Sequence, residues 1–373
     1  DSWLYNENEP FVHIDSLDTY AFLREKIGTD YYEQILEKYF VQNHHCSVVM
    51  MEPKKGLNAL ADEKLEKELE QIKLLMTDME KEKLVEETKH LKTYQETPST
   101  KEEMDKIPML SRKDIKKEAM PLDIQTKSVA GVLSFHHEFP TNGIHYLKFL
   151  FDVKKLPVDM IPYLGLLRSI FSYVDTEKHT YTELSNEIDR FTGGISGTVG
   201  VYQNVKAPDA MSVKFEIKCK TLYEQMPKAI ALISEIIEGS KYDDYKRLYE
   251  LIAEMKSRIQ SNLSNSGSAT ATLRANSYFS KAALLKDKIG GIDFYREIVR
   301  LEKNFETEKA SIASKLKRLA TIIFRKENLM ISSTCTQEEF QRLEPQIKEF
   351  NHHLSDQDFT FSPSELVCEK KNE

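Results

Sequence analysis

Hydrophobic residues in the region 119–354 recur at intervals of two along several short segments, which is the spacing of β-strands. Residues 129–139 and 144–153 are two such segments, and they are predicted to pair as a hairpin because only a short turn separates them. The second segment is largely apolar on both faces, which predicts a central strand in a covered sheet. Further strands are predicted at residues 195–201, 211–219 and 329–335.

The segment 211–219 alternates most strictly. Every second residue from Met211 to Cys219 is apolar, and the residues between them are Ser212, Lys214, Glu216 and Lys218. This pattern predicts a strand with one face in the core and one face in solvent.

Helical spacing dominates the rest of this region. Apolar residues between Ile161 and Val174 line one side of a predicted helix, and the sequence from Thr180 to Glu183 is a capping box for another, which ends at Gly193-Gly194. Four or five helices are predicted within 222–319, and a last helix at 338–353. Because hairpin-linked strands and helices come in mixed blocks, we expect an α+β domain with a mainly antiparallel sheet and helices packed on one face.

Residues 53–118 have a different character, since Glu and Lys dominate and Gly is nearly absent. Leu65, Leu69, Ile72 and Met76 form a narrow apolar seam of the kind found in coiled-coil helices. Thr77 and Glu80 form a capping box, so a second helix is predicted to start there and to end before Pro98. The segment is therefore predicted to be a long antiparallel helical hairpin. Its charged faces are read as solvated surface, with docking as the alternative.

Residues 1–52 are predicted to be the end of a preceding α+β domain. Apolar residues recur at helical spacing within 20–27 and 32–39, and 46–51 has the composition of a buried strand. Two helices and one strand cannot cover a sheet, so their partners are expected upstream of this segment. Residues 355–373 lose periodicity and are predicted to be a truncated linker toward another domain.

Composition excludes some classes of function. A net charge of -8 over 373 residues and a pI near 5.8 argue against a protein-wide nucleic-acid surface. No apolar run reaches the roughly 20 residues that a membrane span needs. The four cysteines are far apart, which favours free and mostly buried thiols in a reducing compartment, the cytoplasm or an organelle matrix. The cysteines are Cys46, Cys219, Cys335 and Cys368.

Neighbouring histidines suggest a zinc site, but their spacing is wrong. A zinc-protease helix needs histidines four residues apart, and the residue four after His137 is Thr141. His136 and His137 lie in a predicted strand, where they point to opposite faces. The pairs His44-His45 and His352-His353 fail for the same reason. We therefore predict that this chain contains no metal ligands and no catalytic residues.

Two other patterns have ordinary structural readings. The segment from Gly193 to Gly200 is glycine-rich, but it follows a helix, whereas a phosphate-binding loop precedes one. It is read as a helix end that leads into a closely packed strand. Arg274 and Tyr278, four residues apart, fall on one predicted helix face. They are read as a surface pair, with contact to a peptide backbone as the alternative.

Several short motifs occur in a specific order along the whole chain. They are Trp3-Leu4-Tyr5, Pro10-Phe11, Asn43-His44-His45, Glu52-Pro53, Ile107-Pro108-Met109-Leu110, Pro140-Thr141-Asn142-Gly143-Ile144-His145-Tyr146, Gly193-Gly194-Ile195-Ser196 and Cys368-Glu369-Lys370-Lys371-Asn372-Glu373. In this order the chain resembles the presequence protease and falcilysin branch of the insulinase-like zinc metallopeptidases.

The resemblance implies a parent protein with two halves of two α+β domains each, joined by a helical hairpin and closing into a peptide-holding chamber. It implies that residues 1–52 end the second domain, 53–118 form the hairpin, 119–354 form the third domain, and 355–373 lead to the fourth. The zinc motif His-x-x-Glu-His would lie upstream, and no substrate-binding residue can be carried over onto this chain.

The implied function is that of a non-catalytic internal portion of a zinc-dependent endopeptidase that degrades short unfolded peptides. Its expected partners are the catalytic N-terminal half and the fourth domain of the same polypeptide, and a peptide substrate, with no nucleic acid and no membrane. The alternative is a fragment of a structural relative that kept the fold and lost the metal, because fold does not fix function.

Overall fold

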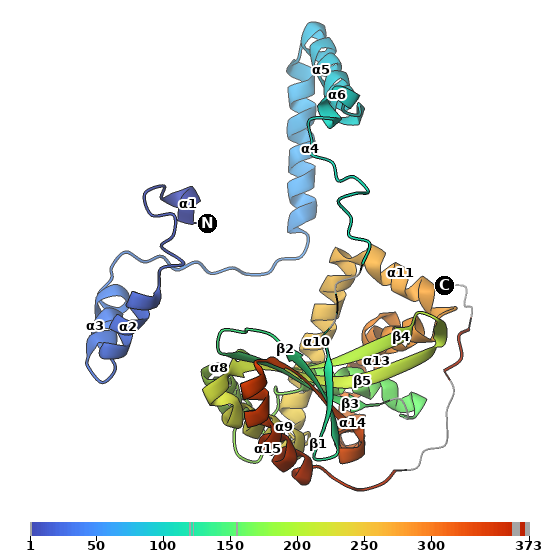
Figure 1. Cartoon of the computed structure of the whole chain (residues 1–373). Helices are drawn as coiled ribbons and strands as arrows, with labels where there is room; N and C mark the ends of the chain where they lie inside the picture. The colour runs from blue at the N-terminus through green and yellow to red at the C-terminus, as the bar shows by residue number, and fades with distance from the viewer. Residues whose placement is uncertain (1, 119–120, 122, 154–155, 360–365, 370–373) are drawn as a thin grey trace. The chain divides into compact units, whose positions relative to one another are not determined.

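The computed structural model describes residues 2–118, 121, 123–153, 156–359 and 366–369. The chain divides into two compact units, Asp1–Lys116 and Lys117–Glu373. Each is described by itself below (Figure 1). None of the helices in the described part of the chain combines the length and the apolar composition that a membrane span requires.

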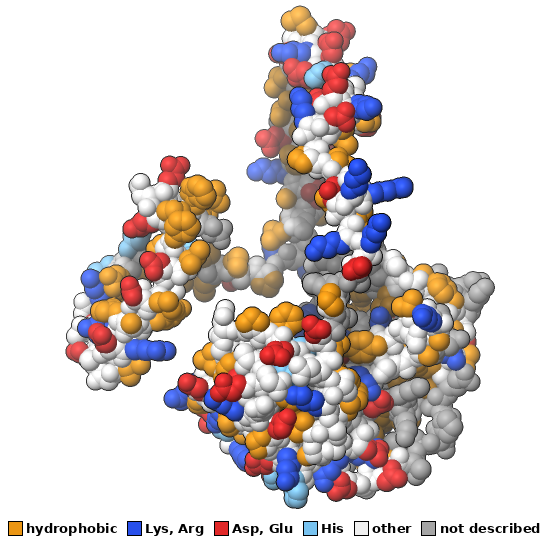
Figure 2. All heavy atoms as spheres, in the orientation of Figure 1, with side chains coloured by type: hydrophobic (Ala, Val, Ile, Leu, Met, Phe, Trp, Pro, Cys, Tyr) orange, Lys and Arg blue, Asp and Glu red, His pale blue; other side chains and the backbone are white. Residues whose placement is uncertain are grey.

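The first segment of unit 1 is helical but has no core. The predicted helices at 20–27 and 32–39 correspond to α2 (Leu17–Glu25) and to α3 (Tyr31–Leu36) with a π-helical turn at Glu37–Val41, and a short α1 covers Ser2–Tyr5. None of these elements contains a buried residue. Figure 2 shows hydrophobic side chains gathered on the surface of this segment.

The prediction of a buried strand at 46–51 is wrong. These residues form no strand, and the side chains of Val48 to Met51 are between 79% and 90% exposed. A strand is stabilised by hydrogen bonds and side-chain contacts to neighbouring strands. Unit 1 offers no strand among its described residues with which this segment could pair.

The helical hairpin is present. Its helices are α4 (Leu57–Leu75) and α5 (Asp78–Glu96), followed by a short α6 (Lys101–Met104). The predicted capping box at Thr77 is confirmed, because the Thr77 hydroxyl accepts from the Glu80 N–H and the Glu80 carboxylate accepts from the Thr77 N–H. Figure 2 shows side chains of both charges over this hairpin.

The apolar seam of α4 is not closed by α5. Leu65, Leu69 and Ile72 remain 54%, 55% and 50% exposed, and neither helix contains a buried residue. Met76, the fourth seam residue, caps the C-terminal end of α4. The hairpin therefore presents an apolar stripe to its surroundings.

Unit 2 contains a six-stranded sheet in the order β1-β2-β6-β3-β5-β4. All neighbouring strands are antiparallel except β2 and β6, which are parallel. The expected α+β fold with a mainly antiparallel sheet is confirmed. The strands are β1 (Gln125–Val129), β2 (Val132–Glu138), β3 (Ile144–Asp152), β4 (Ile195–Asn204), β5 (Ala207–Leu222) and β6 (Leu329–Cys335).

The predicted hairpin between 129–139 and 144–153 is wrong. Strand β2 forms its hairpin with β1, through a turn in which Ala130 and Gly131 both have positive φ angles, and β6 lies between β2 and β3. The turn type was missed because Ala rarely adopts this conformation. The central place of β3 was predicted correctly, since it pairs with β5 on one side and β6 on the other.

Helices cover one face of the sheet, as predicted. Strand β3 alternates buried and exposed residues, with Leu147, Phe149 and Phe151 packed under the helices and Tyr146 46% exposed on the other face. The cover predicted for both faces is thus present on one of them among the described residues. Figure 1 shows α9 and α15 along this layer.

In the described part of unit 2, six α-helices, not four or five, separate β5 from β6. The extra breaks fall at Ser266, where α10 ends, and at the Gly290-Gly291 step between α12 and α13. The helices of unit 2 are α7 (Ile161–Ile170), α8 (Tyr181–Phe191), α9 (Met226–Gly239), α10 (Tyr245–Asn265), α11 (Gly267–Ser277), α12 (Lys281–Gly290), α13 (Ile292–Lys303), α14 (Phe305–Ile323) and α15 (Gln337–His353).

A row of polar residues lies buried beneath α15. His145 is 1% exposed, and its Nε2 is 2.6 Å from the Ser333 hydroxyl on the neighbouring strand. Burial lowers the pKa of His145 to about 4, and the nearby charge of His136 acts in the same direction. His136, also buried, stacks on Phe340 with ring centroids 4.5 Å apart, and burial lowers its pKa as well.

This burial predicts that stability falls in mild acid. The folded-state pKa of His145 lies below the ordinary 6.5, so the unfolded chain binds the proton more tightly as the pH drops through 6.5 toward 4. The stability contributed by neutral His145 is complete above pH 6.5, and its loss by pH 4 amounts to about 3 kcal/mol. Urea unfolding of wild type and His145→Gln between about pH 7 and 4.5 measures this. Equal pH slopes would contradict it.

Candidate functional site

The uncovered face of the sheet contains a cavity of about 550 Å³. Its floor is formed by side chains of four adjacent strands, because residues paired across a sheet point to the same face. One row across the sheet is Ser332 on β6, Lys148 on β3, Lys218 on β5 and Ser196 on β4. The next row contains Thr334, Tyr146 and Lys220. We call this space the lysine cavity.

The lysine cavity is positively charged in an acidic chain. Lys148 and Lys218 are directly paired across β3 and β5, and Lys220 is opposite Tyr146. None of the described residues that line the cavity is an aspartate or a glutamate. Lys218 has a partial partner in Glu216 at 3.5 Å, whereas Lys148 and Lys220 have no carboxylate partner within the described residues.

The charged residues deeper on this face are not solvated as predicted. Lys214 is 9% exposed and its Nζ is 2.5 Å from Asp152, while Glu216 is 2% exposed and accepts a hydrogen bond from the Tyr202 hydroxyl. The expectation of a fully solvent-exposed face for 211–219 is therefore wrong at these two positions. Side chains from β3 and β4 cover them, which alternation within one strand cannot reveal.

The Gly193-Gly194 turn forms one wall of the lysine cavity. Helix α8 ends at Phe191, and Gly194 has a φ of 112°, a conformation that favours glycine. A Cβ at Gly193 would lie 2.5 Å from Cε of Lys220 and 2.7 Å from its Cγ. The absent side chain thus gives Lys220 its position. This agrees with the interpretation of a helix end that leads into a closely packed strand.

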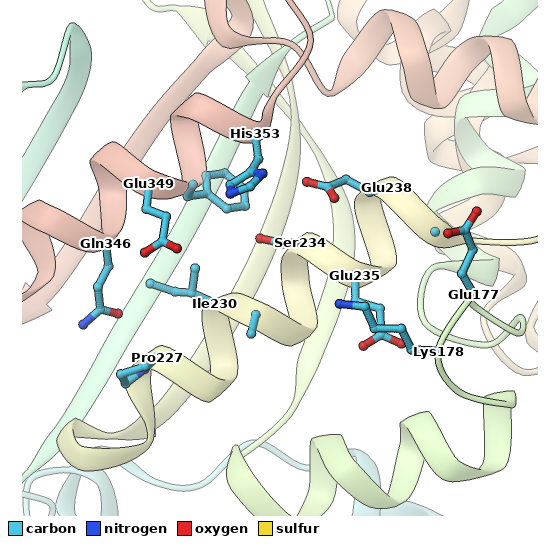
Figure 3. Close-up of a pocket in the computed structure, with 13 residues that line it drawn as sticks. Glu177, Lys178, Pro227, Ile230, Ser234, Glu235, Glu238, Gln346, Glu349 and His353 are labelled. Carbon is cyan, nitrogen blue, oxygen red and sulfur yellow. The ribbon is translucent and has the colours of Figure 1, made fainter.

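A second cavity, of about 360 Å³, lies between α9 and α15 on the helical side (Figure 3). Glu238 on α9 and Glu349 and His353 on α15 point into the space between the two helices. The buried Glu235 is already satisfied, because His179 Nδ1 lies 2.8 Å from its Oε1 and the Thr176 hydroxyl donates to the same oxygen. Glu235 therefore fixes the preceding loop to α9.

The candidate histidines do not come together as a metal site. His136 and His137 point to opposite faces of β2, as predicted, with His136 in the core and His137 at the edge of the lysine cavity. His44 and His45 are exposed in unit 1, and His352 and His353 end α15. Across the described ranges, no three His, Cys, Asp or Glu side chains are grouped to hold a metal ion. The described residues thus do not fit a zinc centre.

Arg274 is not a surface residue, contrary to the prediction. Its side chain is 11% exposed, and its Nη1 lies 2.7 Å from Asp287 and 3.0 Å from Asp293. Tyr278, just after α11, has its ring centroid 5.3 Å from the Arg274 guanidinium carbon, so the two do contact each other. The pair joins α11 to α12 and α13 instead of facing a ligand.

The four cysteines are free, and Cys219 and Cys335 are buried, while Cys46 is exposed and Cys368 is intermediate. Burial raises the pKa of Cys219 to about 12 and raises that of Cys335 as well. Both buried thiols stay protonated at neutral pH and are therefore weak nucleophiles.

Comparison with known proteins places the chain among peptidases. It is 34% identical over its full length to Protein HypA of Clostridium perfringens. It is 24% identical over 353 residues to presequence protease 1, chloroplastic/mitochondrial, of Arabidopsis thaliana, and 28% identical over 327 residues to the mitochondrial presequence protease of Drosophila melanogaster. These matches cover 100%, 93% and 86% of the chain.

The sequence model for the region associated with peptidases of family M16, subfamily C, matches residues 51–301, more than half of the chain. The chain belongs to this peptidase-associated family. The predicted resemblance to the presequence protease branch is confirmed. The chain spans only 38%, 32% and 31% of the lengths of the three relatives.

The lysines of the cavity were missed by sequence reasoning. Each of them alternates with core residues along its own strand, which is typical of a solvated face. The signal that identifies them is the register between β3 and β5, which places Lys148 opposite Lys218. Only the paired sheet contains this information.

Proposed function

We propose that the chain is a non-catalytic internal portion of a zinc-dependent metalloendopeptidase that degrades short unfolded peptides. The observation that carries this is the match to a peptidase-associated family over residues 51–301, in relatives of which the chain spans about a third. In this proposal the zinc centre belongs to another part of a longer protein.

The two units would have different tasks. Residues 53–118 would be the hinge hairpin between the two halves, and its half-exposed apolar seam supports a partner that packs there. Residues 119–354 would be a third domain whose uncovered sheet face lines part of a peptide chamber, which the cavity on that face supports. Residues 1–52 would complete a second domain, which agrees with their many exposed apolar side chains.

The partners in this proposal are the catalytic N-terminal half, the fourth domain and a peptide substrate. The cofactor of the longer protein would be zinc, held outside this chain. Location in the cytoplasm or in an organelle matrix agrees with free cysteines and with relatives that are named mitochondrial or chloroplastic.

Peptide cleavage tests this proposal. The longer protein that contains this chain is expected to cleave unstructured peptides and to lose that activity when a chelator removes its metal. The 373-residue chain alone is expected to cleave none of them. Chelator-sensitive cleavage by the chain alone would overturn the proposal.

A second candidate is a non-catalytic relative that kept the fold. The name "Protein HypA" of the relative at 34% identity leaves room for such a role, since it mentions no protease. Under this alternative the longer protein would bind peptides or a partner subunit, and it would show no chelator-sensitive cleavage.

A further inference from the structure

We propose that the lysine cavity binds a carboxylate group of an extended peptide. The proposal rests on the proposed function, because it takes the uncovered sheet face as a surface that meets peptide. It adds a substrate preference, for peptides with an acidic residue or a free C-terminus placed over β3 and β5.

The first argument is the unfavourable pairing of charges. Like charges directly opposite each other on antiparallel strands destabilise a sheet, and Lys148 and Lys218 are such a pair. Lys220, on the same strand and face as Lys218, adds a third positive charge. Among the described residues only Glu216 approaches this group, and it touches Lys218 alone. An anion bound between the ammonium groups would relieve the repulsion.

The second argument is the chemistry of the surrounding residues. Hydroxyl groups of Ser332, Thr334 and Ser196 border the lysines on the flanking strands and can donate hydrogen bonds to carboxylate oxygens. Tyr146 and Phe139 are 46% and 59% exposed at the cavity, and they offer apolar surface to the rest of a peptide. A volume of about 550 Å³ admits several peptide side chains.

The third argument is the fixed position of Lys220. Its aliphatic stem lies against Gly193, where a Cβ would clash with it, and the Gly193 N–H donates to the Lys220 carbonyl at 2.7 Å. A long side chain held in this way loses less freedom on binding than a free surface lysine. The φ of Gly193 is outside the range that requires glycine, so Gly193→Ala would displace the Lys220 stem and leave the backbone in place.

Fluorescence anisotropy with the whole chain tests the proposal. Three labelled peptides of one neutral sequence differ only in their carboxylates: one has a central Glu and an amidated C-terminus, one has Gln and a free C-terminus, and one has Gln and an amide. We expect the first, the second or both to bind, and the third to bind about tenfold more weakly. The two arms distinguish a side-chain carboxylate from a C-terminal one.

Variants locate the binding. Lys148→Ala/Lys220→Ala is expected to weaken binding of the carboxylate peptides by about tenfold or more, and Gly193→Ala by a smaller factor. The matched control is Lys317→Ala/Lys348→Ala, which removes two exposed lysines from α14 and α15 and is expected to leave binding unchanged. Thermal unfolding checks that each variant folds.

Equal binding of all three peptides would overturn the proposal. So would equal affinities of the cavity variant and the control, or a chain that binds inorganic phosphate at this place and none of the peptides. None of these results depends on cleavage or on zinc, so they are separate from the test of the proposed function.

Discussion

Replacing Phe215 with alanine is expected to lower the free energy of unfolding by about 3–5 kcal/mol. Phe215 is fully buried on β5, and its ring lies 5.7 Å from that of Phe171 and 5.4 Å from that of Phe324. Phe324 in turn contacts Phe151 on β3, with centroids 5.1 Å apart. The alanine variant would leave a cavity at the centre of this cluster, where the sheet meets α7 and α14.

Urea unfolding monitored by circular dichroism measures the loss. The control is Phe279→Ala, which removes a side chain that is 73% exposed and is expected to change stability by less than about 1 kcal/mol. If both variants unfolded at the same urea concentration, the aromatic cluster would not be the core of unit 2.

Replacing Asp287 with alanine is expected to destabilise the protein by about 3 kcal/mol or more. Asp287 is fully buried on α12, where Oδ2 accepts from Arg274 at 2.7 Å and Oδ1 accepts from the Ile292 N–H at 2.8 Å. Its loss would leave the mostly buried guanidinium short of one carboxylate and the first N–H of α13 without its acceptor.

Asp293→Ala is the matched comparison, since Asp293 contacts the same guanidinium at 3.0 Å but is 24% exposed in its side chain. Thermal and urea unfolding should show a loss less than half of that for Asp287→Ala. Equal losses would mean that the burial of Asp287 and its bond to Ile292 contribute nothing.

Features with a local cause could be predicted from the sequence. The capping boxes at Thr77 and Thr180 need only residues three apart, and both are formed. The strand at 329–335 was predicted with its observed bounds because its polarity alternates and a helix follows immediately.

The order of the strands could not be predicted in this way. Strand β6 enters the sheet between β2 and β3, although 188 positions separate Ser333 from His145, which it contacts. No local pattern encodes such a pairing. The same holds for the lysine cavity, because Lys148 and Lys218 become neighbours only through the register of β3 and β5.

The proposed non-catalytic role is tested most directly by measuring bound zinc in the purified chain and in the longer protein that contains it. The account predicts stoichiometric zinc in the longer protein and none above background in the chain, because the described histidines are dispersed or point to opposite faces of a strand. Stoichiometric zinc in the chain alone would contradict it.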